Sequence, residues 1–189
     1  MHPQLAAIVA DFEHARSRMR RIATATPEER WATRSDPRRW SVAECIAHLN
    51  LTSRPYIPLL RAAFNDHPAS TTVVASHRYR RDGAGWLIGM LSGPLPRIGR
   101  FRLGRVKTKP EFVPSVTLER AHVVAEFEAL QDEQIALTRD ASSRPLEQIR
   151  ITSPFDARVR YNAYSCLWLL PRHQHRHLEQ AEAVWSRPS

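Results

Sequence analysis

Apolar residues recur every three or four positions along the first part of the chain, which is the spacing of one face of an α-helix. This stripe comprises Leu5, Ile8, Val9, Phe12, Met19, Ile22 and Ala23, and the arginines between residues 16 and 21 lie off it. The pattern predicts a first amphipathic helix over residues 5–23. A short helical turn that carries Trp31 follows it, because residues 26–29 have the sequence of a helix start.

The next helix is predicted from its first turn. Ser41 and Glu44 have the spacing of a capping box, in which each side chain satisfies a free backbone N–H group of the other residue. Apolar residues at helical spacing follow, namely Val42, Ile46, Leu49, Tyr56 and Leu60. We therefore expect a second helix to about Phe64, with Pro55 and Pro58 as the positions where it kinks.

Helical spacing resumes after Pro114 and again from about Val159, with a loop over residues 144–156 between the two segments. The third stripe is Val116, Val123, Phe127, Leu130 and Leu137, and the fourth contains Ala163, Cys166, Leu167, Leu169, Leu170, Leu178, Ala181, Val184 and Trp185. Four long helices without an internal repeat predict an all-α protein, a four-helix bundle.

A long crossover connection joins the second and third helices over residues 65–115. All six glycines lie in its middle, together with Pro94 and Pro96, and only residues 86–91 have the pattern of a short helix or strand. The chain of 189 residues is within the usual size of one domain. We therefore expect a single domain over residues 1–189 that includes this connection.

The charge of the chain is concentrated in the same connection. The formal net charge is +9, and between residues 76 and 109 nine basic residues face a single acidic one, Asp82. The basic residues are Arg78, Arg80, Arg81, Arg97, Arg100, Arg102, Arg105, Lys107 and Lys109. Such a segment is typical of proteins that bind nucleic acid or lie on an anionic membrane, with residues 86–91 inserted in the second case. A solvated basic loop is the alternative.

The distribution of apolar residues excludes a transmembrane protein. No run approaches the roughly 18 apolar residues of a membrane span, and the N-terminus lacks the apolar stretch of a signal peptide. We therefore expect the protein in the cytoplasm, where its two cysteines, Cys45 and Cys166, stay reduced.

Two histidines of the fourth helix are candidates for chemistry. His173 and His177 are four residues apart, so their side chains lie one above the other on the face that also carries the apolar residues. Such a pair is able to bind one metal ion, the alternative being surface or hydrogen-bonded core histidines. His48, on the flank of the second helix's apolar face, is the candidate third ligand, or else a boundary residue bonded to a carbonyl group. Three imidazoles would leave a coordination position open, as in catalytic sites.

Other polar residues have less support as ligands. His175 points away from the pair, and the remaining histidines, His2, His14, His67, His77 and His122, are expected on the surface. Cys45 and Cys166 are either spare soft ligands or small core residues. Gln180, one turn beyond His177, is either a hydrogen-bonding partner for a ligand or substrate or an exposed glutamine.

Three strings of the sequence resemble the DinB-like (DinB/YfiT) superfamily. Residues 40–49 (WSVAECIAHL) are similar to the second-helix signature of that family, and residues 170–180 (LPRHQHRHLEQ) are similar to its fourth-helix signature. Residues 109–115 (KPEFVPS) resemble the segment that leads into the third helix. The resemblance implies a four-helix bundle that binds a divalent metal ion through His48, His173 and His177.

The resemblance also implies a set of functions. It suggests a divalent transition metal (Zn, Ni or Fe), and a metal-dependent S-transferase that uses a low-molecular-weight thiol, or a hydrolase, acting on a small-molecule substrate. Homodimers are expected on the same ground. The alternative is a non-catalytic bundle whose basic segment 76–109 binds an anionic partner, either nucleic acid or a membrane surface.

Overall fold

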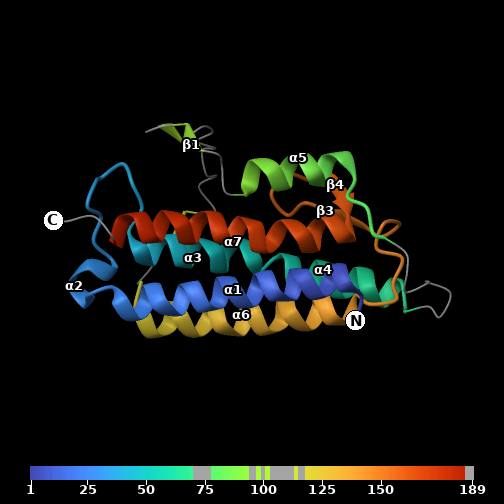
Figure 1. The fold of residues 1–189 in the computed structure, drawn as a ribbon, viewed down its shortest axis with the longest axis horizontal. Coiled ribbons are helices and arrows are strands. Elements are labelled where there is room, and N and C mark those ends of the chain that lie inside the picture. Colours follow the sequence, from blue (N-terminus) through green and yellow to red (C-terminus); the bar gives the residue numbers. More distant parts are fainter. Residues whose placement is uncertain (70–77, 94–96, 99–100, 103–112, 115–117, 186–189) are drawn as a thin grey trace.

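Helices make up most of the structure, a computed structural model that describes residues 1–69, 78–93, 97–98, 101–102, 113–114 and 118–185 (Figure 1). The helices are α1 (Pro3–Ala25), α2 (Glu28–Trp31), α3 (Val42–Ser53), α4 (Tyr56–Asp66), α5 (Gly83–Ser92), α6 (Arg120–Asp140) and α7 (Ala163–Trp185). Two short antiparallel hairpins pair β1 (Arg97–Ile98) with β2 (Phe101–Arg102) and β3 (Arg150–Thr152) with β4 (Arg160–Asn162). The all-α class predicted from the sequence is confirmed.

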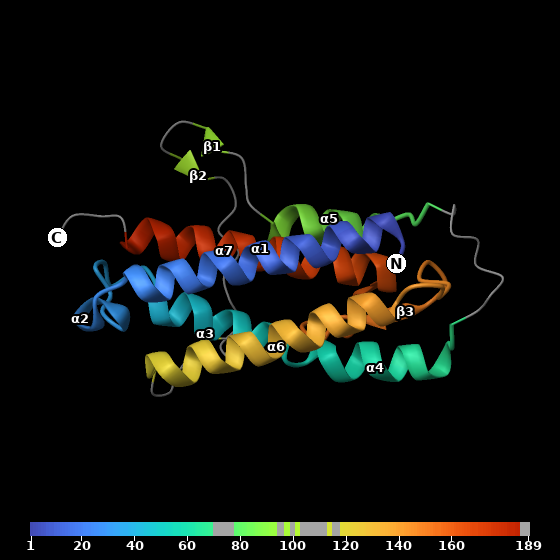
Figure 2. The same cartoon turned by 60° about the horizontal axis from the view of Figure 1, so that its bottom comes forward.

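The long helices pack side by side around a common interior (Figure 2). Helices α1 and α3 each contact both α6 and α7. The residues of the predicted first stripe, from Leu5 to Ala23, are buried along α1. The interior contains two apolar clusters, one near Phe12, Tyr161 and Leu167 and one near Trp31 and Ile46.

A layer of buried glutamines links α6 to α7 inside this interior. Gln131 and Gln174 exchange side-chain hydrogen bonds of 3.0 Å and 2.8 Å, and Gln131 also donates to the carbonyl oxygen of Phe12. Gln134 donates to Gln131 at 3.2 Å. Buried amides that are hydrogen-bonded to one another permit few alternative arrangements, because any other arrangement leaves polar atoms unpaired. This layer therefore fixes the rotation of α7 against α6.

The predicted second helix is divided into α3 and α4. The capping box forms as predicted, since Ser41 accepts from the Glu44 amide and Glu44 accepts from the Ser41 amide. Helix α3 ends at Ser53 because Pro55 has no N–H group to continue the helix. Pro58 causes no break, because it lies in the first turn of α4, where backbone N–H groups have no partner within the helix.

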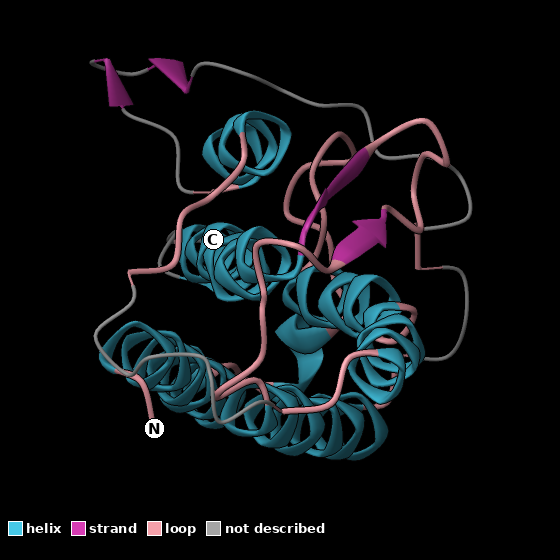
Figure 3. Cartoon of the chain, turned by 90° about the vertical axis from the view of Figure 1, so that its right-hand side faces the viewer, coloured by secondary structure: helices cyan, strands magenta, loops and turns pink. Residues whose placement is uncertain are grey.

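The segment before α7 differs from the prediction. We expected a loop over 144–156 and a helix from about Val159, but the β3–β4 hairpin lies here and α7 begins at Ala163. Figure 3 shows this hairpin beside the ends of the helices. Ile151 and Tyr161 face each other across the hairpin and are buried in the core. The helix that carries Trp31 is present as α2, although Thr26 bonds back to Ile22 and does not cap it.

The predicted short segment of the long connection is α5, which packs on the outer side of α7. Most of the remaining connection, including Arg100, Arg105, Lys107 and Lys109 of the basic segment, lies outside the described residues. The same holds for residues 109–112 and 115 of the string that resembles the family.

Candidate metal centre

Three histidines from two helices converge inside the bundle. Helix α3 supplies His48, and α7 supplies His173 and His177. The ring centroids are 5.4 Å apart for His48 and His173, 4.5 Å for His48 and His177, and 4.6 Å for the α7 pair. One ring nitrogen of each residue lies within 4.8 Å of those of the others. The structure thus brings together the three residues selected from the sequence.

Local sequence positions these side chains. The Ser41–Glu44 capping box fixes the first turn of α3, one turn before His48. Pro171 removes one backbone hydrogen bond just before His173, but α7 runs unbroken from Ala163 to Trp185. Histidines spaced four apart on a continuous helix project from the same face. Pro171 therefore does not separate the pair.

The environment of the cluster favours neutral imidazoles. His48 and His177 are buried, and His173 is partly exposed. Burial, then His48 and Arg176, lower the pKa of His173 to about 3. The pKa of His177 is also lowered well below its ordinary value, first by burial and then by the charges of His173, His48 and Arg176. A hydrogen bond with Gln180 raises it by a smaller amount. Neutral imidazole is the form that binds metal ions.

The donor set suits a divalent transition metal. Three imidazole nitrogens are ligands that Zn, Ni, Fe and Cu accept, and no carboxylate or thiolate joins them among the residues that the structure describes. Nδ1 of His177 is buried without a hydrogen-bond partner in the same part of the chain. A buried polar atom without a partner is costly, and a bound metal ion would satisfy this one.

Trp40 is a site residue that the sequence reasoning missed. Its ring centroid lies 4.8 Å from that of His48 and 5.9 Å from that of His177. Trp40 precedes the capping box by one residue, in a loop, so helical periodicity carries no information about the direction of its side chain. The indole ring covers one side of the histidine cluster.

The other candidate ligands named from the sequence lie outside the histidine cluster. Cys45 and Cys166 are buried thiols, and burial raises the pKa of Cys45 to about 12 and also raises that of Cys166. Neither belongs to the histidine cluster. His175 lies 3.0 Å from Arg18 on another side of α7, as predicted. The expected surface position holds for His14, His67 and His122, whereas His2 is partly buried and caps α1, and His77 lies outside the described residues.

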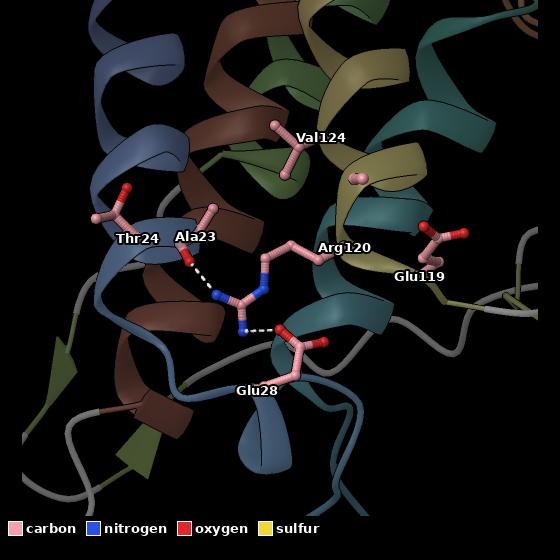
Figure 4. A pocket seen from close by; sticks show the side chains of 7 residues that line it. Ala23, Thr24, Glu28, Glu119, Arg120 and Val124 are labelled. Carbon is pink, nitrogen blue, oxygen red and sulfur yellow. Dashed lines mark hydrogen bonds and ion pairs between the residues drawn. The ribbon is translucent and has the colours of Figure 1, made fainter.

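An open pocket of about 560 Å³ lies elsewhere, between α1, α2 and α6 (Figure 4). Its one basic group is Arg120, which donates to the Ala23 carbonyl at 2.7 Å and pairs with Glu28 at 3.1 Å. The same guanidinium lies over the ring of Trp31. These contacts hold Arg120 at the joint between the three helices, away from the histidine cluster.

Comparisons with known proteins identify the family. The family model of the DinB superfamily matches residues 11–181, which is most of the chain and includes all three histidines. Neither a curated protein nor a solved structure gives a match. The helical fold and the position of the histidines agree with this assignment, and the chain belongs to the DinB superfamily.

Proposed function

We propose that this protein binds a divalent transition metal through His48, His173 and His177 and uses it to activate a thiol or a water molecule. The observation that carries the proposal is the convergence of three imidazoles with ring nitrogens within 4.8 Å, one of which is buried without a partner. The reaction class is S-transfer or hydrolysis on a small-molecule substrate. When bound, the ion supplies Lewis acidity, which makes a thiol or water nucleophilic near neutral pH.

The chain's own residues perform three tasks in this proposal. The three imidazoles hold the ion, and the lowered pKa values of His173 and His177 keep these two neutral as ligands. Trp40 excludes water from one side of the cluster. Access for a small molecule is from the side of His173, which is the partly exposed member. Three protein ligands leave at least one coordination position for the thiol or water.

The test is the metal content of untagged, purified protein measured by mass spectrometry. We expect about one equivalent of a transition metal in the wild type, as one three-ligand site requires, and none in His173→Ala/His177→Ala. A matched variant, His14→Ala/His175→Ala, removes two histidines outside the cluster and should keep the metal. No metal in the wild type after incubation with Zn²⁺ or Ni²⁺, or equal content in all three proteins, would refute the proposal.

If the site is loaded, the second step is a screen of reactions with that ion. Transfer of a low-molecular-weight thiol to an electrophile and hydrolysis of esters and amides are the two classes to compare. Activity that requires the metal and is lost in His173→Ala/His177→Ala supports an enzyme. Full metal occupancy without activity in either class would leave metal binding standing and contradict the catalytic part.

A further inference from the structure

Helix α5 presents an apolar face that nothing in the described structure covers. Its ten residues, Gly83–Ser92, include no charged side chain. One face packs against α7, where Gly85 and Gly89 meet Ser165 and Trp168. The opposite face carries Trp86, Leu87, Met90 and Leu91, which are between 42% and 52% exposed. In the described residues, only Met1 and Leu59 are comparable exposed apolar residues.

This face belongs to a fixed helix. At the start of α5, Asp82 accepts from the Gly85 amide at 3.2 Å, and Ser165 and Arg150 each donate to Asp82 at 2.9 Å. At its end, Arg172 and Arg176 of α7 donate to the carbonyl oxygens of Gly89 and Leu91. The helix lies outside the main group of helices, with α7 beneath it (Figures 1 and 3). A fixed, exposed apolar face of this kind marks an interaction surface.

The charge beside this face is positive. Exposed Arg78, Arg80 and Arg81 directly precede α5, and Arg172 and Arg176 of α7 reach its last turns. Asp82 is paired with Arg150, and Glu147, which accepts from the Arg80 amide at 2.6 Å, offsets only one of these charges. A suitable partner must combine negative charge with an apolar region.

An anionic lipid surface meets both requirements. Anionic headgroups attract arginines at the membrane surface, and apolar side chains enter the boundary between headgroups and acyl chains. Tryptophan, with its apolar ring and polar N–H group, favours this boundary. A second copy of the chain would bring two sets of arginines together, which is unfavourable. Nucleic acid would pair with the arginines but would leave four apolar side chains without a partner.

We propose that α5 docks the protein peripherally on membranes that contain anionic phospholipids. Trp86, Leu87, Met90 and Leu91 enter the interface, and Arg78 and Arg80 lie at the headgroups. No helix of the described part of the chain is long and apolar enough to cross a bilayer. The proposal is independent of metal binding, because none of the three histidines belongs to α5.

The test is co-sedimentation of the full chain with vesicles of phosphatidylcholine alone or mixed with phosphatidylglycerol. We expect binding to the anionic vesicles only, weakened by salt. Leu87→Ser/Leu91→Ser should reduce the partition coefficient by about tenfold or more, since each leucine loses its burial. Leu59→Ser, on α4, should bind as the wild type does.

The arginines are tested separately. Arg78→Gln/Arg80→Gln should bind more weakly, and its binding should depend less on salt, than Arg21→Gln/Arg139→Gln, which removes two exposed arginines elsewhere.

A fluorescence measurement on the intact protein guards against misfolded variants. Entry of Trp86 into the interface should shift the tryptophan emission to shorter wavelength on addition of anionic vesicles, and Trp86→Phe should abolish the shift. Absence of binding, or equal binding by Leu87→Ser/Leu91→Ser with an unchanged emission spectrum, would overturn the proposal. So would a dimer in sedimentation velocity that the serine variant dissociates, or tight binding of duplex DNA that only the arginine variant loses.

Discussion

His48 and His177 lie with their ring centroids 4.5 Å apart, although α3 and α7 are far apart in the sequence. This contact joins a single histidine to a pair whose spacing on one helix already favours metal binding. Loss of the third imidazole should therefore weaken metal binding as much as loss of either member of the pair.

We predict that His48→Ala lowers the affinity for Zn²⁺ by at least about 100-fold, because even outer residues around metal ligands typically account for 10–100-fold. Competition with a chromophoric chelator measures the affinity. The control is His122→Ala, which removes an exposed histidine of α6. If His48→Ala binds Zn²⁺ as tightly as the control does, His48 is not a ligand.

Trp40 should report on occupancy of the site. Its ring centroid lies 4.8 Å from His48, so a Co²⁺ or Cu²⁺ ion held by the histidines would quench its emission through its partly filled d shell. We predict stoichiometric quenching in the wild type and loss of most of it in Trp40→Phe. Trp86→Phe, on α5, should be quenched as the wild type is. Equal quenching in both variants would place the ion elsewhere.

The sequence predicts those parts of the site that depend on local periodicity. The capping box of Ser41 and Glu44 locates the start of α3, and the four-residue spacing of His173 and His177 puts both side chains on one face of α7. Both signals are confined to one helix. The contact of His48 with this pair also depends on how α3 packs on α7, and here the family resemblance supplied what spacing left open.

Features that depend on packing between distant segments escaped prediction. Trp40 lies in a loop and reaches the histidines only through the tertiary fold. The Gln131–Gln174 contact joins two helices. Gln174 lies on the apolar stripe, four residues from Leu170 and from Leu178, but helical periodicity does not show which partner it meets. The β3 and β4 strands have three residues each, too few to show an alternating pattern against the helical stripe that follows.

The stability of the protein should depend on Glu44 at acidic pH. Burial alone would raise the pKa of Glu44, but hydrogen bonds from Arg34 and from the Ser41 amide outweigh it and hold the pKa below its ordinary value of 4.5. A lowered pKa in the folded state stabilises the fold at pH values above 4.5. This stabilisation is lost as the pH falls below that value.

Urea unfolding between about pH 6 and pH 3 tests this relation. We predict that Glu44→Gln loses about 1–2 kcal/mol near neutral pH, because it weakens the cap and the Arg34 ion pair. Its stability should also vary less with pH than that of the wild type. Glu29→Gln, at an exposed position of α2, serves as the control. Parallel pH profiles for the wild type and Glu44→Gln would contradict the assignment.

The buried glutamines should stabilise the bundle as a unit. Gln131→Met or Gln174→Met leaves the partner amide buried without its hydrogen bond, which costs about 1–3 kcal/mol. The double variant removes both amides, so its cost should be smaller than the sum by about 0.5–3 kcal/mol. Urea unfolding of the four proteins gives this coupling energy. Strictly additive effects would mean that the two side chains do not interact.

The attachment of α5 to α7 should depend on Gly89. A Cβ atom at this position would overlap the ring of Trp168, whose neighbours Arg81 and Arg172 lie 4.3 Å and 4.7 Å from the ring centroid. Alanine normally favours a helix over glycine by about 1 kcal/mol. Here we predict that Gly89→Ala destabilises the protein by about 1–3 kcal/mol, because the overlap forces the helices apart.

Gly83→Ala is the matched control, since a Cβ atom there meets nothing within 4 Å. It should leave the unfolding free energy unchanged or raise it slightly. Thermal unfolding compares the stability of the two variants. Vesicle binding is a second comparison, because a displaced α5 would present its apolar face in another orientation. If Gly89→Ala is as stable as Gly83→Ala, α5 does not rest on Trp168, and the fixed surface proposed for membrane docking loses its structural basis.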